Sequence, residues 1–140
     1  MNPLYTAEAL AVGAGRDGRV TTPDGRVDLD LAVPAAMGGS GNGSNPEQLF
    51  AAGYSACFHS ALALAARERK VKIDGSSVGA RVQIGSNDDG GFGLAVTLEV
   101  VIPDVEPALA RELADRAHEV CPYSNATRGN IEVDVQVGDD

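Results

Sequence analysis

The stretch that decides the fold is NPEQLFAAGYSACFHSALALAARERK, residues 45 to 70. Asn45 is a favourable helix cap, Pro46 suits the first helical position, and Gln48 completes the spacing of a capping box. The basic residues at the far end complement the negative end of a helix dipole. The stretch therefore predicts one long helix that runs from Asn45 to about Lys70.

Nineteen consecutive residues of this helix, Gln48 to Ala66, carry no formal charge. That length comes close to a bilayer span. However, seven of the nineteen are alanine, and Gln, Gly, Ser and His residues dilute the run further. A helix that is apolar on nearly every side is also what the middle of a packed assembly requires. We therefore expect the helix to lie inside a protein assembly, not in a membrane.

Chain length and net charge limit the number of domains and the kinds of partner to expect. With 140 residues the chain suits one domain, residues 1–140, with a core of its own. The formal net charge of −9 would repel nucleic acid and anionic membrane surfaces, so neither is expected as a partner. The N-terminus lacks the basic start and apolar stretch of a signal peptide, which predicts a cytoplasmic protein.

The remaining elements are short strands and a second helix. Strands are predicted at residues 4–12, 19–22, 27–33, 78–85, 92–102 and 131–137. A turn is predicted at 23–25 and a flexible linker at 38–44. The second helix opens at Pro107 and ends near Cys121, because Pro122 follows. Three strands, a helix, two strands, a helix and a strand give an α+β fold with mostly antiparallel pairing.

The two cysteines, Cys57 and Cys121, are either two unrelated buried thiols or a redox couple, because structural disulfides rarely persist in the cytosol. Because free cysteine is among the most buried residue types, residue type alone leaves these two interpretations about equally supported. Cys57 lies mid-helix among apolar residues, and such burial disfavours the thiolate and raises the pKa of a thiol. Cys57 would stay inert unless a fixed cation offset that cost.

Neither a metal nor a bound cofactor is expected. A closed zinc site would need both cysteines and both histidines, His59 and His118. Cys57 and His59 are two positions apart on a helix and therefore point to different sides. The glycine-rich segment 38–44 lacks the Lys-Ser/Thr ending of a phosphate-binding loop.

Five segments carry a family resemblance: LYTA at 4–7, GRDG at 15–18, NPEQLFAAGYSACF at 45–58, GGFGL at 90–94 and AHEVCPYSNATRGNIEV at 117–133. Together they resemble the organic hydroperoxide resistance (Ohr) branch of the OsmC/Ohr family, nearly from end to end. The form CPYSNATRGN favours the Ohr branch over OsmC proper. The resemblance implies mostly antiparallel sheets wrapped around central helices, in an intertwined homodimer with sites at its interface.

The resemblance also implies an activity, that of an antioxidant thiol peroxidase (EC 1.11.1.-) acting on alkyl and fatty-acid hydroperoxides. Cys57 would be the peroxidatic cysteine and Cys121 the resolving one, joined during turnover by a redox-active disulfide. Arg16, within GRDG, would hold Cys57 as a thiolate, and Glu47 would orient Arg16. The implied reductant is an external dithiol, the dihydrolipoyl group of a lipoylated partner protein.

The position of Glu47 raises a geometric question. Glu47 and Cys57 are ten positions apart, about 15 Å along a continuous helix, and so cannot join one site within the same chain. Either the helix breaks near Gly53, or Glu47 serves the partner subunit's Cys57 across a two-fold interface. We favour the second, because a helix apolar on every face needs more cover than one short chain provides.

Other interpretations remain beside this one. Arg19 competes with Arg16, and only the GRDG match selects Arg16. Glu47 alone reads equally well as a favourable charge at a helix N-terminus. The alternative functions are an OsmC-type peroxidase with broader substrate use, and a non-catalytic module that binds an apolar ligand or senses oxidation by forming a disulfide.

Overall fold

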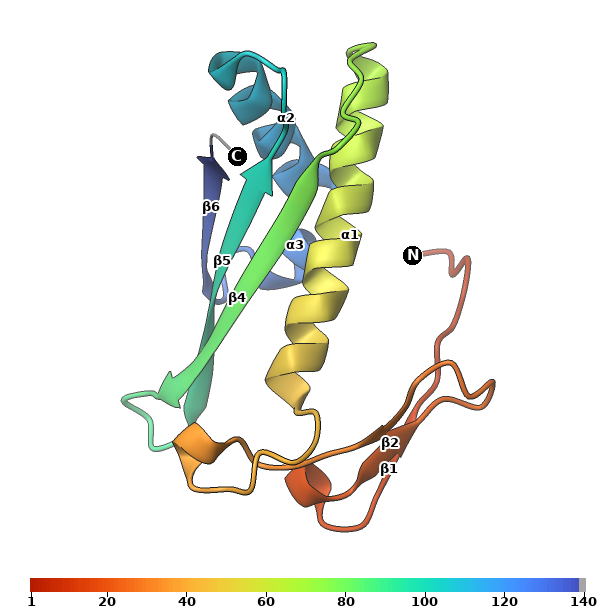
Figure 1. Ribbon diagram of the computed structural model, residues 1–140, viewed down its shortest axis with the longest axis vertical. Helices are drawn as coiled ribbons and strands as arrows, with labels where there is room; N and C mark the ends of the chain where they lie inside the picture. The colour runs from red at the N-terminus through yellow and green to blue at the C-terminus, as the bar shows by residue number, and fades with distance from the viewer. Residues whose placement is uncertain (139–140) are drawn as a thin grey trace. The chain divides into compact units, whose positions relative to one another are not determined.

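The structure is a computed structural model, and it describes residues 1–138. The elements, drawn in Figure 1, are β1 (Leu10–Val12), η1 (Gly15–Asp17), β2 (Arg19–Thr21), β3 (Asp28–Asp30), η2 (Ala35–Met37), α1 (Pro46–Glu68), β4 (Ser77–Ser86), β5 (Phe92–Val101), α2 (Pro107–Val120), α3 (Pro122–Thr127) and β6 (Glu132–Gly138). Two compact units divide the chain, Met1–Leu49 and Phe50–Asp140, and each is described by itself. That the whole chain makes one domain stays a prediction.

The first unit contains the antiparallel sheet β1-β2-β3. Its turn is confirmed at 23–25: Gly25 donates its N–H to the carbonyl of Thr22 at 3.0 Å and adopts φ +74°. The strand predicted from Leu4 is wrong at its start, because β1 begins at Leu10. The neighbouring strand β2 is only three residues long and therefore pairs with Leu10–Val12 alone.

The glycine-rich segment 38–44 is packed, although a flexible linker was expected. Ser44 pairs with Leu31, and the carbonyl of Ser44 accepts the N–H of Ala32 at 2.9 Å. A Cβ on Gly43 would come within 2.7 Å of the Asp30 carbonyl oxygen, so the backbones meet too closely for any side chain. This contact fixes the chain just before the helix cap.

Helix α1 begins as predicted. Asn45 caps it, since its Oδ1 accepts the N–H of Gln48 at 2.8 Å. The helix passes Gly53 without a break and ends at Glu68, two residues before the predicted end. Lys70 adopts φ +57°, a left-handed conformation that stops a helix.

In the second unit, β4 and β5 form a ten-residue antiparallel hairpin, and β6 pairs with β5 in parallel. The α+β fold with mostly antiparallel pairing is confirmed, and this parallel pair is the exception. Every second residue of β4 and of β6 is exposed, so one face of the sheet stays open. The other face supplies the buried side chains of β5, namely Val96, Leu98 and Val100.

The core of the second unit lies between this sheet and the helices. Figure 1 shows α1 and α2 running side by side along the sheet. The largest buried side chains are Tyr54, Phe58 and Leu62 of α1, Leu98 of β5 and Leu113 of α2. Within residues 1–138, α1 is the one helix long and apolar enough to cross a membrane by length and composition. Its buried residues instead make it the central helix of this core.

Helix α3 was not predicted. Pro122 does end α2, but the chain turns at Cys121 and starts a new helix at once. Proline disfavours helical backbone in the residue before it, and Cys121 accordingly has ψ 125°. Proline is also well suited to the first position of a helix. Cys121 therefore forms an extended junction between two helices.

Candidate active site

The structure brings the two predicted cysteines into contact. Cys57 lies in the middle of α1, and Cys121 lies 64 residues later at the α2–α3 junction. Their sulfur atoms are 3.6 Å apart, with the thiol of Cys121 donating towards Cys57 Sγ, and both cysteines are free. Cys121 is fully buried and Cys57 is half-buried. A disulfide bond is about 2.05 Å long, so a modest local shift would join the two sulfurs.

The surroundings of Cys57 within its own unit favour the protonated thiol. Burial is the main cause that raises the pKa of Cys57, and the neighbouring Cys121 thiol raises it further. The backbone N–H of Tyr123 acts in the opposite direction and lowers the pKa. No cation stands among these causes in the described part of this unit. That Cys57 needs a fixed cation to become a reactive thiolate stays a prediction.

In the other unit, Arg16 and Glu47 form a two-pronged ion pair. Nη1 and Nη2 of Arg16 donate to the two carboxylate oxygens of Glu47 at 2.8 and 2.6 Å. The hydrogen bond to Arg16 is the main cause that lowers the pKa of Glu47, and the pKa of Arg16 is raised in return. The side chain of Glu47 is 15% exposed and that of Arg16 is 35% exposed, so the guanidinium keeps an open side.

The loop that carries Arg16 is held by close backbone contacts. Arg16 lies in η1, between Gly15 at φ +65° and Gly18. A Cβ on Gly18 would come within 2.1 Å of the Val12 carbonyl oxygen, so only glycine fits there. The carboxylate of Asp17 accepts the N–H of Val33 at 3.0 Å. These contacts fix η1 to the segment that follows β3.

Arg19, the competing arginine, is occupied elsewhere. Its guanidinium donates to Asp30 at 2.6 Å and also to Asp28, both on the neighbouring strand β3. These three side chains form an exposed cluster on the small sheet. The geometry therefore separates the two arginines: Arg16 is the one joined to Glu47. The roles of Arg16 and Glu47 stay predictions.

Sequence reasoning missed a set of buried hydroxyl groups beside the cysteines. The hydroxyl of Tyr54 is 2.8 Å from Ser124 Oγ and 3.1 Å from Thr127 Oγ1. Nδ1 of His118 is 2.8 Å from the same Ser124 oxygen. The signal present in the sequence was spacing alone: Tyr54 is three residues before Cys57, while His118 and Ser124 flank Cys121 by three residues on each side.

The histidines are engaged separately. His118 contacts Ser124, whereas Nε2 of His59 lies 2.9 Å from Ser76 Oγ. Burial is the main cause that lowers the pKa of His118. Residues 1–138 contain no group of three or more side chains arranged to hold a metal ion. That the protein works without a metal or cofactor stays a prediction.

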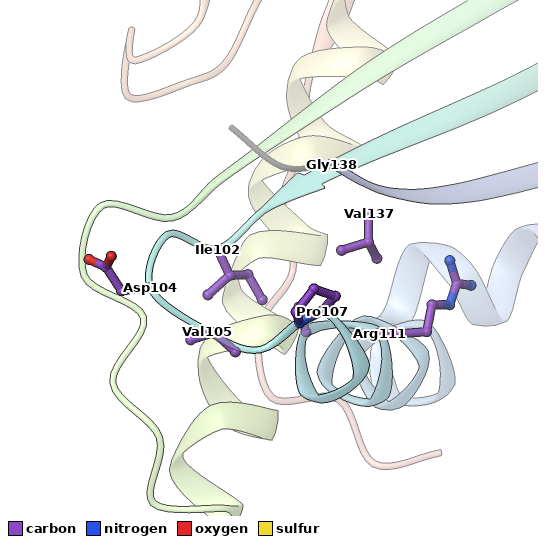
Figure 2. Close-up of a pocket in the computed structure, with 8 residues that line it drawn as sticks. Ile102, Asp104, Val105, Pro107, Arg111, Val137 and Gly138 are labelled. Carbon is purple, nitrogen blue, oxygen red and sulfur yellow. The ribbon is translucent and has the colours of Figure 1, made fainter.

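The pocket in Figure 2 is not this site. It has a volume of about 420 Å³ and lies between the loop after β5, the start of α2 and the end of β6. Ile102, Val105, Pro107 and Val137 turn their side chains towards it. Neither cysteine lines this pocket, and Cys121 lies at the opposite end of α2.

Comparison with known proteins identifies the family. Residues 39–136 match the OsmC family, described as OsmC-like protein. The organic hydroperoxide resistance protein of Xanthomonas axonopodis pv. citri is 50% identical over 93% of this chain and 92% of its own length. The organic hydroperoxide resistance protein OhrB of Bacillus subtilis is 46% identical over 96% of this chain and 98% of its own.

A solved structure agrees with this comparison. The crystal structure of an organic hydroperoxide resistance protein from Elizabethkingia anophelis superposes with a TM-score of 0.94 at 48% identity. The match covers all of both chains. Fold and sequence agree, so the chain belongs to the OsmC family, in its organic hydroperoxide resistance branch.

Proposed function

We propose that this protein is a thiol peroxidase that reduces organic hydroperoxides to alcohols. One observation carries the proposal: the Cys57 and Cys121 sulfurs lie 3.6 Å apart as free thiols, in an apolar setting. The named relatives, which are organic hydroperoxide resistance proteins, support the same chemistry. Peroxide detoxification in the cytoplasm follows as the role.

The proposed reaction has two steps on the protein. The Cys57 thiolate attacks the outer peroxide oxygen; the O–O bond breaks, Cys57 becomes a sulfenic acid, and the alkoxide leaves and takes a proton to become the alcohol. The Cys121 thiol then attacks the Cys57 sulfur, an S–S bond forms, and water leaves. A dithiol reductant, proposed to be the dihydrolipoyl group of a lipoylated protein, returns both thiols and becomes a disulfide itself.

The first step needs a cation that the surroundings of Cys57 lack. We propose Arg16 for this role, because the guanidinium fork that grips Glu47 keeps an open side for a second anion. Glu47 would fix the orientation of Arg16. Since α1 is unbroken, the ten positions from Glu47 to Cys57 leave the Arg16–Glu47 pair to serve the partner subunit's Cys57.

A homodimer is therefore part of the proposal. Ala52, Ala56, Ser60 and Leu64 recur every four residues on α1 and are exposed, although the helix is central to the core. Residues spaced by four lie on one face, and small side chains allow two helices to approach closely. We propose that a second copy of the protein packs against that face.

Complementation between two inactive variants tests the shared site. Arg16→Ala and Cys57→Ser are each expected to be nearly inactive alone. If Arg16 acts across the interface, a mixed dimer contains one intact site, and random mixing restores about a quarter of wild-type activity. If Arg16 acts within its own chain, no mixed dimer contains an intact site, and the mixture stays inactive.

The activity itself is tested by steady-state turnover with reduced lipoamide. We expect rapid consumption of a fatty-acid hydroperoxide and of tert-butyl hydroperoxide, and much slower consumption of hydrogen peroxide. Comparable rates on all three would favour the broader OsmC-type peroxidase. A single oxidation without turnover would favour the redox sensor and would overturn the enzymatic proposal.

A further inference from the structure

Four polar side chains form a continuous hydrogen-bond chain beside the two cysteines. The chain begins at His118 Nδ1 and runs through Ser124 Oγ and the Tyr54 hydroxyl to Thr127 Oγ1, which also lies 3.2 Å from the carbonyl oxygen of Ser124. Tyr54 and Ser124 are fully buried, and Thr127 is 5% exposed. The chain joins α1 to the end of α2 and to α3, so it ties together segments about 70 residues apart.

Taking each of the four contacts as one hydrogen bond sets the direction of every bond in this chain. The Ser124 carbonyl only accepts, so the hydroxyl hydrogen of Thr127 goes there. Tyr54 must then donate to Thr127, and Ser124 must donate to Tyr54. The last contact is left to His118, which must donate from Nδ1 to Ser124. Four hydrogens fill four contacts only in this one arrangement, and neutral His118 is thereby the Nδ1–H tautomer.

The hydrogen-bond chain holds the backbone on both sides of the contact between the Cys57 and Cys121 thiols. Tyr54 lies one turn before Cys57 on the same helix, so its ring and the Cys57 sulfur face the same neighbours. Ser124 and His118 lie three residues after and before Cys121. Because Cys121 sits in an extended junction, the helical backbone is interrupted there and does not by itself fix the angle between α2 and α3. The Arg128 guanidinium, which donates to the His118 carbonyl, is one bond across the junction. Bonds from α1 to α3 and from α2 to α3 supply that constraint.

We propose that Tyr54, Ser124 and His118 are positioning residues that hold the Cys121 thiol against Cys57, so that disulfide formation outruns further oxidation of Cys57. This inference rests on the proposed peroxidase function. None of the three residues touches the peroxide. They keep the effective concentration of the Cys121 thiol at Cys57 high.

The direction of the chain predicts that it survives protonation of His118. The pKa of His118 is lowered by burial and by Arg128 and Arg111, while Asp115 raises it. Both ring nitrogens of the imidazolium donate, so the Nδ1 bond to Ser124 persists in acid. If His118 accepted from Ser124 instead, protonation would break the chain, and the thiol pairing would weaken as the pH fell.

The main test compares two tyrosine variants of the same aromatic cluster. Tyr54→Phe removes two contacts of the chain but keeps the ring, which packs 5.7 Å from the Tyr123 ring, measured between centroids. Tyr123→Phe is the matched control, since the Tyr123 hydroxyl has no hydrogen-bond partner among the described residues. The Cys57–Cys121 disulfide of each variant is brought to equilibrium with dithiothreitol, and the fractions of disulfide and dithiol protein are measured by intact mass.

Tyr54→Phe is expected to lower the effective concentration of the thiol pair about tenfold, the order expected from losing two buried hydrogen bonds. Tyr123→Phe should match the wild type. Equal values for the two variants would overturn the inference. The dithiothreitol equilibrium involves no peroxide, so it tests the positioning chain even if the proposed peroxidase activity fails.

With peroxide, the same variants test the consequence for turnover. Tyr54→Phe should keep the rate of the first attack and raise the yield of Cys57 sulfinic acid per turnover about tenfold over Tyr123→Phe, if disulfide formation slows in proportion. An equal sulfinic acid yield in the two variants would overturn the link to over-oxidation.

A second pair of variants addresses His118, the half-buried end of the hydrogen-bond chain, where a substitution disturbs less of the core than one at the fully buried Tyr54. His118→Asn retains an N–H donor near the position of Nδ1, whereas His118→Leu does not. We expect His118→Asn to rescue the dithiothreitol equilibrium and His118→Leu to lose several-fold. In the wild type, ¹⁵N spectra should report a protonated Nδ1 and an unprotonated Nε2 in neutral His118. The opposite tautomer, or equal effects of Asn and Leu, would overturn the assignment.

Discussion

Replacing Arg16 by alanine should raise the pH at which Cys57 becomes reactive. The ordinary pKa of a cysteine thiol is 9.0, and burial raises the pKa of Cys57 above that value. Without a cation, at most about 1% of Cys57 is thiolate at pH 7. Half ionisation at that pH requires the pKa to fall by at least two units, about 2.7 kcal/mol at 1.36 kcal/mol per unit.

One guanidinium is sufficient for this shift. A unit charge about 4 Å from the sulfur contributes about 4 kcal/mol at an effective dielectric constant of 20. Because the Arg16 side chain is 35% exposed, solvent screening removes part of that amount. The remainder is of the size needed, so the Arg16→Ala variant should lose nearly the whole thiolate population at neutral pH.

The assay is the pH dependence of alkylation by iodoacetamide in a Cys121→Ser background, so that Cys57 is the one thiol present. Reactivity follows the thiolate, so the rate rises as the pH passes the pKa of Cys57. We expect Arg16→Ala to move the midpoint upward by about two units and to slow the reaction at pH 7 about fiftyfold, as the thiolate fraction falls from about one half to about 1%.

Arg19→Ala is the matched control, since Arg19 lies three residues away and pairs with Asp28 and Asp30 instead. Its alkylation profile should overlay that of the parent. If the Arg16→Ala and Arg19→Ala profiles coincide, the assignment of Arg16 as the activating cation is refuted.

Further predictions concern the thiols, an ion pair and the core. Cys57→Ser should abolish peroxide consumption, while Cys121→Ser should complete one attack and then accumulate sulfinic acid on Cys57, as intact mass will report. Because Arg16 lowers the pKa of Glu47, the stabilisation by their pair is present above the ordinary pKa of 4.5 and is lost as the pH falls through the lowered value. Glu47→Gln should therefore reduce the free energy of unfolding in urea at neutral pH but not in strong acid, and a loss of equal size at both would contradict this reasoning. Leu98 is fully buried in β5, so Leu98→Ala should lower the free energy of unfolding by about 2–5 kcal/mol in the same unfolding experiment.

Local chemistry explains which parts of the fold were predictable. The cap at Asn45, the proline start of α2 and the turn at 23–25 depend on residues adjacent in sequence, and all three are present. The strand predicted from Leu4 failed because its length depends on a partner strand, which the sequence pattern does not disclose. Helix α3 was missed because a proline that ends one helix also suits the start of another.

The residues of the site also divide into those that the sequence predicted and those that it did not. The contact between Cys57 and Cys121 was expected from two segments that resemble one family, although 64 residues separate the sulfurs. The Arg16–Glu47 pair was expected on the same ground, since neither residue stands out by type or spacing. The Tyr54 hydroxyl gave no such sign, because a tyrosine on an apolar helix reads as packing until its partners on α3 are known.

The parallel pairing of β5 with β6 has a consequence for how the protein matures. Parallel neighbours require a crossover, and here that crossover consists of α2, the Cys121 junction and α3. The junction in the middle of this crossover places Cys121 against Cys57 of α1. During synthesis Cys57 is added 64 residues before Cys121, so the pair of thiols is complete only once α2 and the junction after it have been made.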